Sequence, residues 1–261
     1  MKATFIFLIL FCFATTGRPQ HQPIISTKDY VLASAMLRFR TTCYDSSPVV
    51  FVNVHENEST SVRAWLQVMN APRQHCLVEC QHEKLRLISF IYKKKKYRID
   101  PNRIFTTAGS SATLKKYNDT YDTTVISKVN QLSAFVISSF IKNKKLVVAL
   151  HNNTEGRYSI KSYLPNGEEA INAAEVHLNG QKDSDDFFYT TERIYFDFLK
   201  NKGCNVALQS IAKATDDGSL SVYCAQNKIP YINIEAQDGH LAEQSEMIKT
   251  VDELIRFFKI R

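Results

Sequence analysis

Short blocks of apolar residues follow one another along the chain, and their spacing changes from block to block. Continuous β-branched and apolar runs at residues 49–54 and 146–150 predict buried strands. Apolar residues that recur at intervals of three and four predict amphipathic helices at residues 59–69 and 125–140. By the same criteria, further helices are expected at residues 28–40, 191–199 and 241–258, and further short strands at residues 158–163, 205–209, 220–224 and 231–234.

One hairpin is expected between these elements. Alternating segments at residues 85–92 and 97–99 flank the four lysines at residues 93–96, which fit a solvated turn. Strands that alternate with helices, with one hairpin added, predict an α/β fold. We expect a three-layer α/β/α sandwich with a mixed, mostly parallel central sheet.

The N-terminal residues have the pattern of a signal peptide. Lys2 precedes an apolar run at residues 5–13, and small residues from Ala14 to Gly17 follow it. The run is shorter than the roughly 20 apolar residues that span a bilayer, and no later segment is expected to span one. Residues 1–17 are therefore expected to be removed, which leaves residues 18–261 as a single secreted or periplasmic domain.

Composition and charge exclude some classes of protein. Hydrophobic residues make up 44% and charged residues 23%, as in ordinary globular domains. The net charge of +7 comes without a basic helix or an aromatic-interleaved basic stripe, so no nucleic-acid partner is expected. After the signal peptide, five cysteines remain: Cys43, Cys76, Cys80, Cys204 and Cys224. An odd number permits at most two disulfides within one chain. The Cys76/Cys80 pair lacks the second pair of a zinc finger, and the residues around it are expected to form a strand that leads into the hairpin.

Three predicted strands are followed by side chains that carry chemistry. His55 and Glu58 follow the strand at residues 49–54, His151 follows that at 146–150, and Glu235 follows that at 231–234. In open α/β sheets, reactive groups gather beyond the carboxyl ends of strands. Each residue alone has an ordinary alternative, as a loop histidine or as an acid favoured at a helix start. Together they favour a shared site.

His55, Glu58 and His151 fit the ligands of a catalytic zinc ion. His55 and Glu58 are three residues apart at a strand-to-helix turn, so both side chains can face one ion. With His151 as the third ligand, the fourth position stays open for water, whose pKa zinc lowers to around 7. Glu235, fixed at a strand end on the same sheet edge, suits the general base that takes the proton.

A polar turn, Asp100-Pro101-Asn102-Arg103, follows the hairpin. A guanidinium group binds a carboxylate through two parallel hydrogen bonds, and an amide adds a directed donor. Asn102 and Arg103 are therefore candidate binding residues for a substrate carboxylate. The alternative is an ordinary turn with a solvated Arg103.

These motifs, taken in order, resemble the zinc metallocarboxypeptidase family and its succinylglutamate desuccinylase and aspartoacylase relatives. The residues that carry the resemblance are His55-x-x-Glu58, Asp100-Pro101-Asn102-Arg103, His151 and Glu235, which together cover most of the expected mature chain. The resemblance implies Zn²⁺ held by His55, Glu58 and His151, and a water molecule activated by Glu235. It also implies that Asn102 and Arg103 hold the free carboxylate of a peptide or N-acyl amino acid substrate.

The sequence departs from the family pattern in some respects. Pro101 replaces the usual Leu, and the intervals between motifs are shorter than in digestive carboxypeptidases. No motif marks a separate oxyanion-binding arginine, for which Arg63 and Arg157 are candidates. The implied activity is hydrolysis of amide bonds next to a free carboxylate, as in a carboxypeptidase acting on cell-wall or envelope peptides.

Two alternatives stay open. Residues 148–153 also resemble the second histidine segment of zinc-dependent N-acetylmuramoyl-L-alanine amidases, although the opening Gly-rich histidine motif of those enzymes is missing. The other alternative is a non-catalytic protein that keeps the fold and binds acidic ligands or peptide ends through Arg103.

Overall fold

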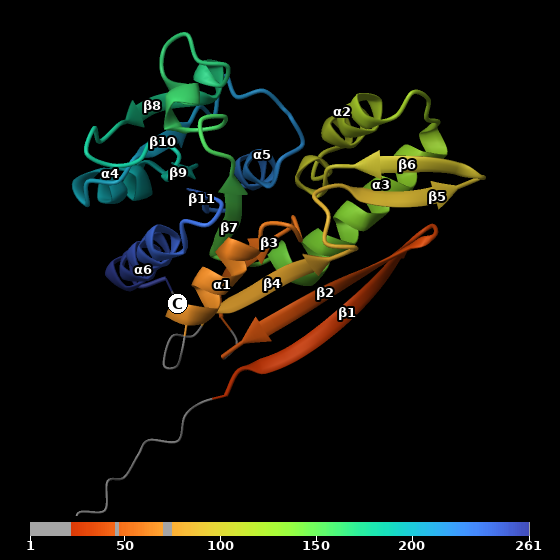
Figure 1. Cartoon of the computed structure of the whole chain (residues 1–261), viewed down its shortest axis with the longest axis horizontal. Coiled ribbons are helices and arrows are strands. Elements are labelled where there is room, and N and C mark those ends of the chain that lie inside the picture. The colour runs from red at the N-terminus through yellow and green to blue at the C-terminus, as the bar shows by residue number, and fades with distance from the viewer. Residues whose placement is uncertain (1–21, 45–46, 70–74, 261) are drawn as a thin grey trace, which may run out of the picture.

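The structure is a computed structural model of the 261-residue chain, and it describes residues 22–44, 47–69 and 75–260. The expected signal peptide at residues 1–17 lies outside the described residues. Within them, one mixed sheet has the strand order β1-β2-β4-β3-β7-β11-β9-β10-β8, and β5 pairs with β6 in a separate hairpin (Figure 1).

The main sheet has a parallel centre. Its strands are β1 (Ile24–Leu32), β2 (Ala35–Cys43), β3 (Val49–Asn53), β4 (Cys76–Gln81), β7 (Leu146–Asn153), β8 (Ala173–His177), β9 (Phe187–Thr190), β10 (Val206–Gln209) and β11 (Tyr231–Gln237). The run β4-β3-β7-β11 is parallel, as is the pair β9 and β10. The other pairs, β1/β2, β2/β4, β11/β9 and β10/β8, are antiparallel. The predicted mixed α/β sheet is confirmed.

Helices cover both faces of this sheet. The α-helices are α1 (Ser59–Val68), α2 (Thr107–Tyr117), α3 (Thr123–Val136), α4 (Arg193–Asn201), α5 (Leu220–Gln226) and α6 (Leu241–Phe257), and the shorter helical turns are η1 (Pro101–Arg103), η2 (Ile137–Ile141), η3 (Ile160–Tyr163) and η4 (Ala170–Asn172). Apolar residues of α1, α4 and α6 belong to one core cluster, whereas those of α2, α3 and α5 belong to another. The arrangement is the expected three-layer sandwich.

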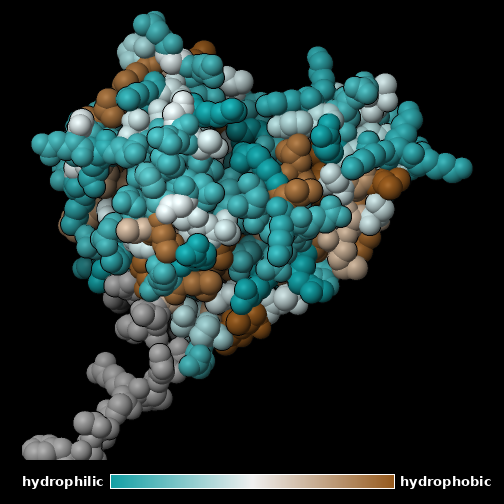
Figure 2. Space-filling model, viewed as in Figure 1, coloured by the Kyte–Doolittle hydropathy of each residue, from teal (hydrophilic) through white to brown (hydrophobic). Residues whose placement is uncertain are grey.

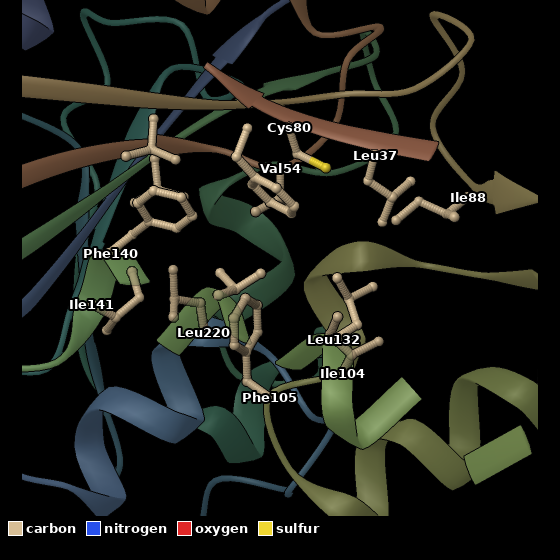
Figure 3. Packing of buried hydrophobic residues seen from close by; sticks show 14 of the residues in the cluster. Leu37, Val54, Cys80, Ile88, Ile104, Phe105, Leu132, Phe140, Ile141 and Leu220 are labelled. Carbon is tan, nitrogen blue, oxygen red and sulfur yellow. The ribbon is translucent and has the colours of Figure 1, made fainter. Parts of the chain in front are cut away.

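Strand alternation divides the core between the two faces. Val50 on β3 belongs to the cluster with α2, α3 and α5, whereas its neighbour Phe51 belongs to the cluster with α1, α4 and α6. Figure 3 shows the first cluster, in which Leu37 from the sheet lies opposite Leu132 of α3 and Leu220 of α5. Each such buried side chain stabilises the fold by about 1.5–3 kcal/mol.

The helix expected at residues 28–40 is wrong, because β1 and β2 form an antiparallel hairpin there. Leu32 pairs with Ala35, so the connection consists of two residues. Ala33 in this connection has a φ of 53°, the left-handed conformation that two-residue hairpin turns require. Leu37 and Phe39 are buried on alternate positions of β2, so the periodicity is that of a strand.

The hairpin around the lysines is confirmed. Its strands are β5 (Ile88–Tyr92) and β6 (Lys95–Ile99). Lys93 and Lys94 form the connection with φ angles of 48° and 66°, so only these two of the four lysines occupy the turn.

Two predicted strands are wrong. Residues 158–163 contain η3, and residues 220–224 lie in α5. In both places a serine caps the turn: the side chain of Ser159 accepts from Lys161 N, and that of Ser219 accepts from Val222 N. The other predicted strands and helices are present, whereas α2, β8 and β9 were not predicted.

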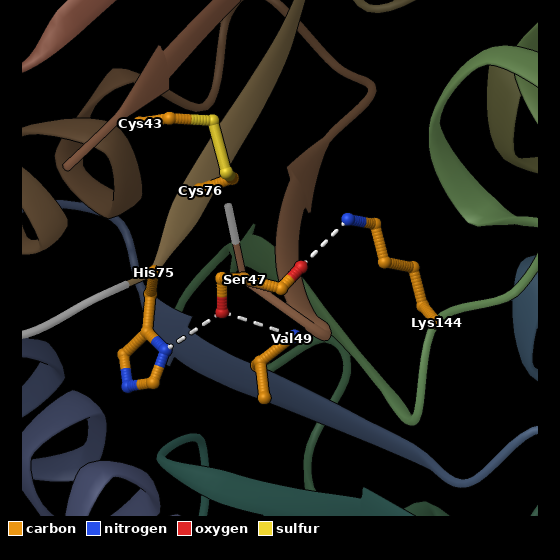
Figure 4. The surroundings of a disulfide bond; sticks show 6 residues. All are labelled: Cys43, Ser47, Val49, His75, Cys76 and Lys144. Atoms are coloured by element: carbon orange, nitrogen blue, oxygen red, sulfur yellow. Dashed lines mark hydrogen bonds between the residues drawn. A yellow bond between two sulfur atoms is a disulfide. The ribbon is translucent and has the colours of Figure 1, made fainter. Parts of the chain in front are cut away.

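A disulfide between Cys43 and Cys76 joins the end of β2 to the start of β4 (Figure 4). Beside it, Val49 N donates to Ser47 Oγ at 3.1 Å, and Lys144 Nζ donates to the Ser47 carbonyl oxygen at 2.7 Å. These contacts fix the chain where it enters β3. Free thiols among the described residues are Cys80, Cys204 and Cys224, all buried.

Among the described residues, the continuous helix Thr123–Ile141 is long and apolar enough to cross a membrane by length and composition alone. Core helices of globular proteins pass the same test. Here Val125, Val129 and Leu132 pack into the core beside the sheet, whereas Thr124 and Gln131 are exposed. This is the pattern of an amphipathic helix that covers a sheet. The face of the molecule seen in Figure 2 is mainly hydrophilic, with apolar side chains in scattered patches.

Candidate active site

Three neighbouring strands bring the chemically active residues together. β3, β7 and β11 are adjacent and parallel, so their carboxyl ends lie at one edge of the sheet. His55 lies just beyond β3, whereas His151 and Glu235 lie near the ends of β7 and β11. His151 and Glu235 are direct register partners on these two strands.

His55, Glu58 and His151 form a compact, buried cluster. The Nδ1 atoms of His55 and His151 each lie 2.8 Å from an oxygen of the Glu58 carboxylate, and 3.3 Å from each other. The backbone N–H of Glu58 donates to the His55 carbonyl oxygen at 3.0 Å, which holds both residues on one tight turn before α1. The structure therefore brings the three predicted ligands to a single point.

The spacing of these donor atoms fits a small divalent cation. One donor atom from each residue lies within 4.8 Å of the other two, and this is the only such group among the described His, Cys, Asp and Glu residues. Ligands at roughly 2.0–2.1 Å from a tetrahedral zinc ion are about 3.3–3.4 Å apart. The two Nδ1 atoms already have this separation.

Asp100 holds His55 from the other side of the imidazole ring. Its Oδ1 lies 2.8 Å from His55 Nε2 and also accepts from Asn102 N at 2.9 Å. Asp100 N donates to Thr113 Oγ1 at 2.9 Å, which ties the turn to α2. The carboxylate directs Nδ1 of His55 toward Glu58 and His151. In the sequence, Asp100 is recognisable only as part of a polar turn.

Opposite charges dominate this buried cluster. Burial would raise the pKa of Glu58, but His55 and His151 hold it well below its usual range. Burial would lower the pKa of His55, yet Glu58 and Asp100 raise it to about 9. Without a metal, the cluster is thus an imidazolium between two carboxylates, and a metal ion would replace the proton.

Arg86 is a further charged side chain at this cluster that no motif in the sequence indicated. Its Nη1 donates to Glu58 Oε1 at 2.7 Å, and its Nη2 lies 3.8 Å from Asp100 Oδ2. The side chain is 49% exposed. It lines a cavity that opens beside His151 and Glu235. Of the two arginines predicted for an oxyanion role, Arg157 lines the cavity but is exposed, and Arg63 on α1 does not line it. No local motif marks Arg86, because its role depends on tertiary contacts.

Asn102 and Arg103 lie on η1, which forms the predicted turn, and both line the cavity. Asn102 Nδ2 is 3.3 Å from His151 Nε2, and Asn102 Oδ1 accepts from Leu220 N at 3.2 Å. Asn102 therefore orients His151 in addition to facing the cavity. Arg103 Nε is 3.4 Å from Asp217 Oδ2, so its charge is already partly balanced.

Two glycines fix this wall by close backbone contact. A Cβ on Gly109 would lie 2.1 Å from the Cα of Gly218, and a Cβ on Gly218 would lie 2.6 Å from the carbonyl oxygen of Arg103. Gly218 also has a φ of 77°, and its carbonyl oxygen accepts from Phe105 N at 2.9 Å. Only residues without a Cβ allow this approach, which holds Asp217 against Arg103.

A cavity of about 420 Å³ opens beside His151 and Glu235. Tyr231, Asn233 and Glu235 occupy alternate positions of β11 and so share one face of the sheet. Tyr189 of β9 lies in register with Asn233 and extends this floor. The walls comprise residues of the turns and loops above it, including Asn102, Arg103, Asp217, Tyr158, Tyr163, Glu169 and Asn172.

Glu235 is buried in the floor of this cavity, with 6% of its surface exposed. Asn233 Nδ2 donates to Glu235 Oε2 at 3.0 Å and fixes the carboxylate. Burial raises the pKa of Glu235, against the opposing effect of His151. A carboxylate with a raised pKa suits a group that takes up a proton during a reaction.

No protein-family model matches the chain, and no curated protein matches it in sequence.

Among solved structures, the chain is similar to succinylglutamate desuccinylase from Vibrio parahaemolyticus, with 10% identity and a TM-score of 0.44. The similarity covers 89% of this chain and 78% of that one. A proposed metallopeptidase from Shewanella baltica has 10% identity and a TM-score of 0.43, with coverage of 87% and 85%. The tripeptide-bound cell shape determinant Csd4 from Helicobacter pylori has 11% identity and a TM-score of 0.44, with coverage of 91% of this chain and 56% of that one. At these values, no such likeness assigns a substrate or a reaction to this chain.

Proposed function

We propose that the chain is a zinc-dependent hydrolase that cleaves an amide bond next to a free carboxylate, in a peptide or an N-acyl amino acid. One observation carries this proposal: His55, Glu58 and His151 converge through two Nδ1 atoms and a carboxylate, with Glu235 in register beside His151. Two nitrogens, one carboxylate and an open position form the donor set of catalytic zinc. Bound zinc supplies Lewis-acid chemistry, which polarises a carbonyl group and makes water nucleophilic at neutral pH.

The other side chains have separate roles in this proposal. Glu235 takes the proton of the attacking water and delivers it to the leaving nitrogen. Arg86, at the cavity surface beside Glu58, donates hydrogen bonds to the carbonyl oxygen as negative charge develops on it. Asn102 and Arg103 hold the substrate carboxylate, and Arg103 shares its charge between that group and Asp217.

Metal content is the direct test of the cluster. The mature protein, supplied with zinc, is expected to hold about one ion per chain, as three protein ligands and one open position imply. A His55→Ala, His151→Ala variant is expected to lose it. His177→Ala, which changes a half-buried histidine on β8, is the matched control and should keep the ion. Equal zinc content in both variants would reject the proposed ligands.

Hydrolysis separates this function from its alternatives. N-acyl amino acids, their C-terminal amides and cell-wall fragments are offered side by side to the zinc-loaded protein. Cleavage that persists after the terminal carboxylate is amidated contradicts the role of Asn102 and Arg103. Cleavage of a sugar–peptide linkage alone favours an amidase, whereas zinc binding with no turnover favours a binding protein.

The proposal includes a secreted or periplasmic location, where the substrates would be cell-wall or envelope peptides. The N-terminal pattern of Lys2, the apolar run and the small residues up to Gly17 supports this location. Mass spectrometry of the protein recovered from its native host should find a mature N-terminus near Arg18. An intact N-terminus on a cytoplasmic fraction contradicts it.

A further inference from the structure

The β5–β6 hairpin and the helix after it hold the excess positive charge of the chain. Residues 93–118 contain eight lysines and arginines and one acid, Asp100, whereas the whole chain contains 33 and 26. The rest of the chain therefore carries as many acids as bases, 25 of each. Lys93 to Lys96 are all exposed, and Figure 1 shows that the tip of their hairpin extends away from the main sheet. We propose that this tip docks the protein on an anionic lipid bilayer, a binding function separate from the proposed hydrolysis.

The geometry of the turn does not account for its lysines. Lys93 and Lys94 have φ angles of 48° and 66°. A two-residue turn with positive φ at both positions favours Asn followed by Gly, because most side chains are strained there. Two lysines at these positions weaken the turn and place two charges at the outermost point of the hairpin. The stability of the hairpin thus gives no reason for them, whereas an anionic partner does.

Few acids neutralise this charge. Lys93 lies 3.7 Å from Asp122, and both side chains are more than half exposed, so the pair contributes little to stability. Within the described part of the chain, Lys94 to Lys96 and Arg98 form no ion pair. These cations stay free to meet a negative surface, and clusters of four or more lysines are typical of segments that bind anionic lipids.

A hollow of about 440 Å³ lies between β6 and the end of α2. It is lined by Lys95, Lys96, Arg98, Tyr117, Asn118, Asp119 and Thr120. Asn118 fixes its shape, because Asn118 Oδ1 accepts from Arg98 N and Asn118 Nδ2 donates to the Arg98 carbonyl oxygen, both at 2.8 Å. Three cations against one acid leave the hollow positive. The phosphate of a lipid headgroup matches these donors.

Exposed apolar side chains accompany the charges, which favours a bilayer over a soluble polyanion. Ile91 is 54% exposed and pairs across the hairpin with Lys96. Its N–H donates to Ser34 Oγ at 2.7 Å, so the turn of the β1–β2 hairpin lies beside β5. Val31 and Met36, register partners next to that turn, are 63% and 60% exposed. In Figure 2, apolar side chains lie beside the hydrophilic protrusion that the hairpin forms. A bilayer offers charged headgroups above an apolar interior and so matches both kinds of side chain.

The tip is separate from the metal cluster. Arg86, which contacts Glu58, precedes β5, and Lys93 follows β5. A strand of this length spans roughly 17 Å at about 3.3 Å per residue. The lysines can therefore be replaced without a change at a proposed metal ligand, and zinc content reports whether a variant keeps its fold.

The test is co-sedimentation of the zinc-loaded mature protein with lipid vesicles. Vesicles of phosphatidylcholine alone are compared with vesicles that also contain about 30% phosphatidylglycerol, an anionic lipid. The wild type is expected to bind the anionic vesicles about tenfold more tightly than the neutral ones. This preference should disappear as the salt concentration rises from about 0.1 M to about 1 M, because the Debye length falls from about 10 Å to about 3 Å.

Three variants separate the contributions. A variant with Gln in place of all four residues Lys93 to Lys96 should lose the preference for anionic vesicles. Ile91→Ser keeps every charge and should weaken binding about threefold. The matched control removes the same charge from exposed positions elsewhere, with the substitutions Lys161→Gln, Lys182→Gln, Lys213→Gln and Lys228→Gln, and should bind as the wild type does.

Equal binding of the wild type to neutral and anionic vesicles overturns the inference. An equal loss in the two fourfold variants also overturns it, because net charge alone would then explain the binding. Duplex DNA or heparin that binds through Lys93 to Lys96 and is unaffected by Ile91→Ser, while vesicles bind weakly, assigns a soluble polyanion in place of a bilayer. None of these results bears on the proposed hydrolase function, which zinc content and turnover test separately.

Discussion

Oδ1 of Asp100 lies 2.8 Å from Nε2 of His55, on the side of the imidazole opposite Glu58 and His151. The contact joins the turn after the β5–β6 hairpin to the turn after β3, two segments that are distant in sequence. It sets which ring nitrogen of His55 is free to bind a metal ion, because the other nitrogen is occupied.

Asp100→Ala is therefore expected to weaken zinc binding without removing a ligand. Loss of such a carboxylate partner typically lowers metal affinity by about 10–100-fold. Competition with a chromophoric chelator measures the change, and Asp119→Ala, at an exposed loop position, is the control. Unchanged affinity in Asp100→Ala would mean that the buried cluster holds His55 in place without this contact.

Glu235→Gln is expected to separate metal binding from turnover. The amide keeps the size of the side chain but cannot accept a proton, so kcat should fall by about 10²–10⁴-fold while the zinc content stays at the wild-type value. Glu155→Gln, an exposed loop substitution, should leave both quantities unchanged. A Glu235→Gln enzyme with normal kcat would assign the base role to another group.

Gly109→Ala tests the backbone contact that positions the cavity wall. The new Cβ would lie 2.1 Å from the Cα of Gly218, so the loop with Asp217 must move. Overpacking of this kind costs about 1–3 kcal/mol in the free energy of unfolding, and KM is expected to rise because Arg103 loses its fixed position. The comparison is Gly180→Ala, where a Cβ would meet nothing within 4 Å. Chemical denaturation and steady-state kinetics provide the two readouts, and equal results for both variants would contradict the contact.

The stability of the metal-free protein should fall as the pH rises from about 6.5 to about 9. Burial disfavours the charged imidazole of His55, but Glu58 and Asp100 outweigh it and raise its pKa from 6.5 to about 9. The folded state therefore binds this proton more tightly than the unfolded state. The resulting stability is fully present below pH 6.5 and is lost as the pH rises through 9.

Zinc should reverse this trend, since it needs the neutral imidazole. The difference in Tm between zinc-loaded and chelator-treated protein is expected to grow over the same pH interval. Thermal unfolding at several pH values measures it. A His55→Gln variant removes the titrating group, and its metal-free Tm should depend less on pH than that of the wild type. A flat metal-free profile in the wild type speaks against the buried ion pair.

The sequence was sufficient for the elements that carry the site, because their patterns are local. The buried apolar runs at the start of β3, β7 and β11 are continuous, and the candidate site residues lie near or just beyond the ends of these strands. The β1–β2 hairpin was missed because its turn at Ala33 and Ser34 lacks the Asn-Gly or Gly residues that mark two-residue turns. The spacing of the apolar residues on the two strands was therefore interpreted as that of a helix.

The parts of the site that escaped prediction depend on contacts between distant segments. Arg86 reaches Glu58 across 28 positions, and Asp100 reaches His55 across 45. The contact of Arg103 with Asp217 likewise depends on the close approach of Gly109 and Gly218. Spacing along the chain gives no measure of such distances, so no local pattern marked Arg86.

The place of β11 in the sheet has a consequence for how the protein is made. This strand comes next to last among the elements of the chain, yet it lies between β7 and β9 and hydrogen-bonds to both. The β9-β10-β8 end of the sheet is therefore joined to the rest of the sheet through a segment that is synthesised after all the other strands of this sheet. An incomplete or cleaved chain that stops before Tyr231 lacks this junction and also lacks Glu235. The same strand thus couples assembly of the sheet to assembly of the proposed site, and chains that end before it are expected to carry no hydrolytic activity.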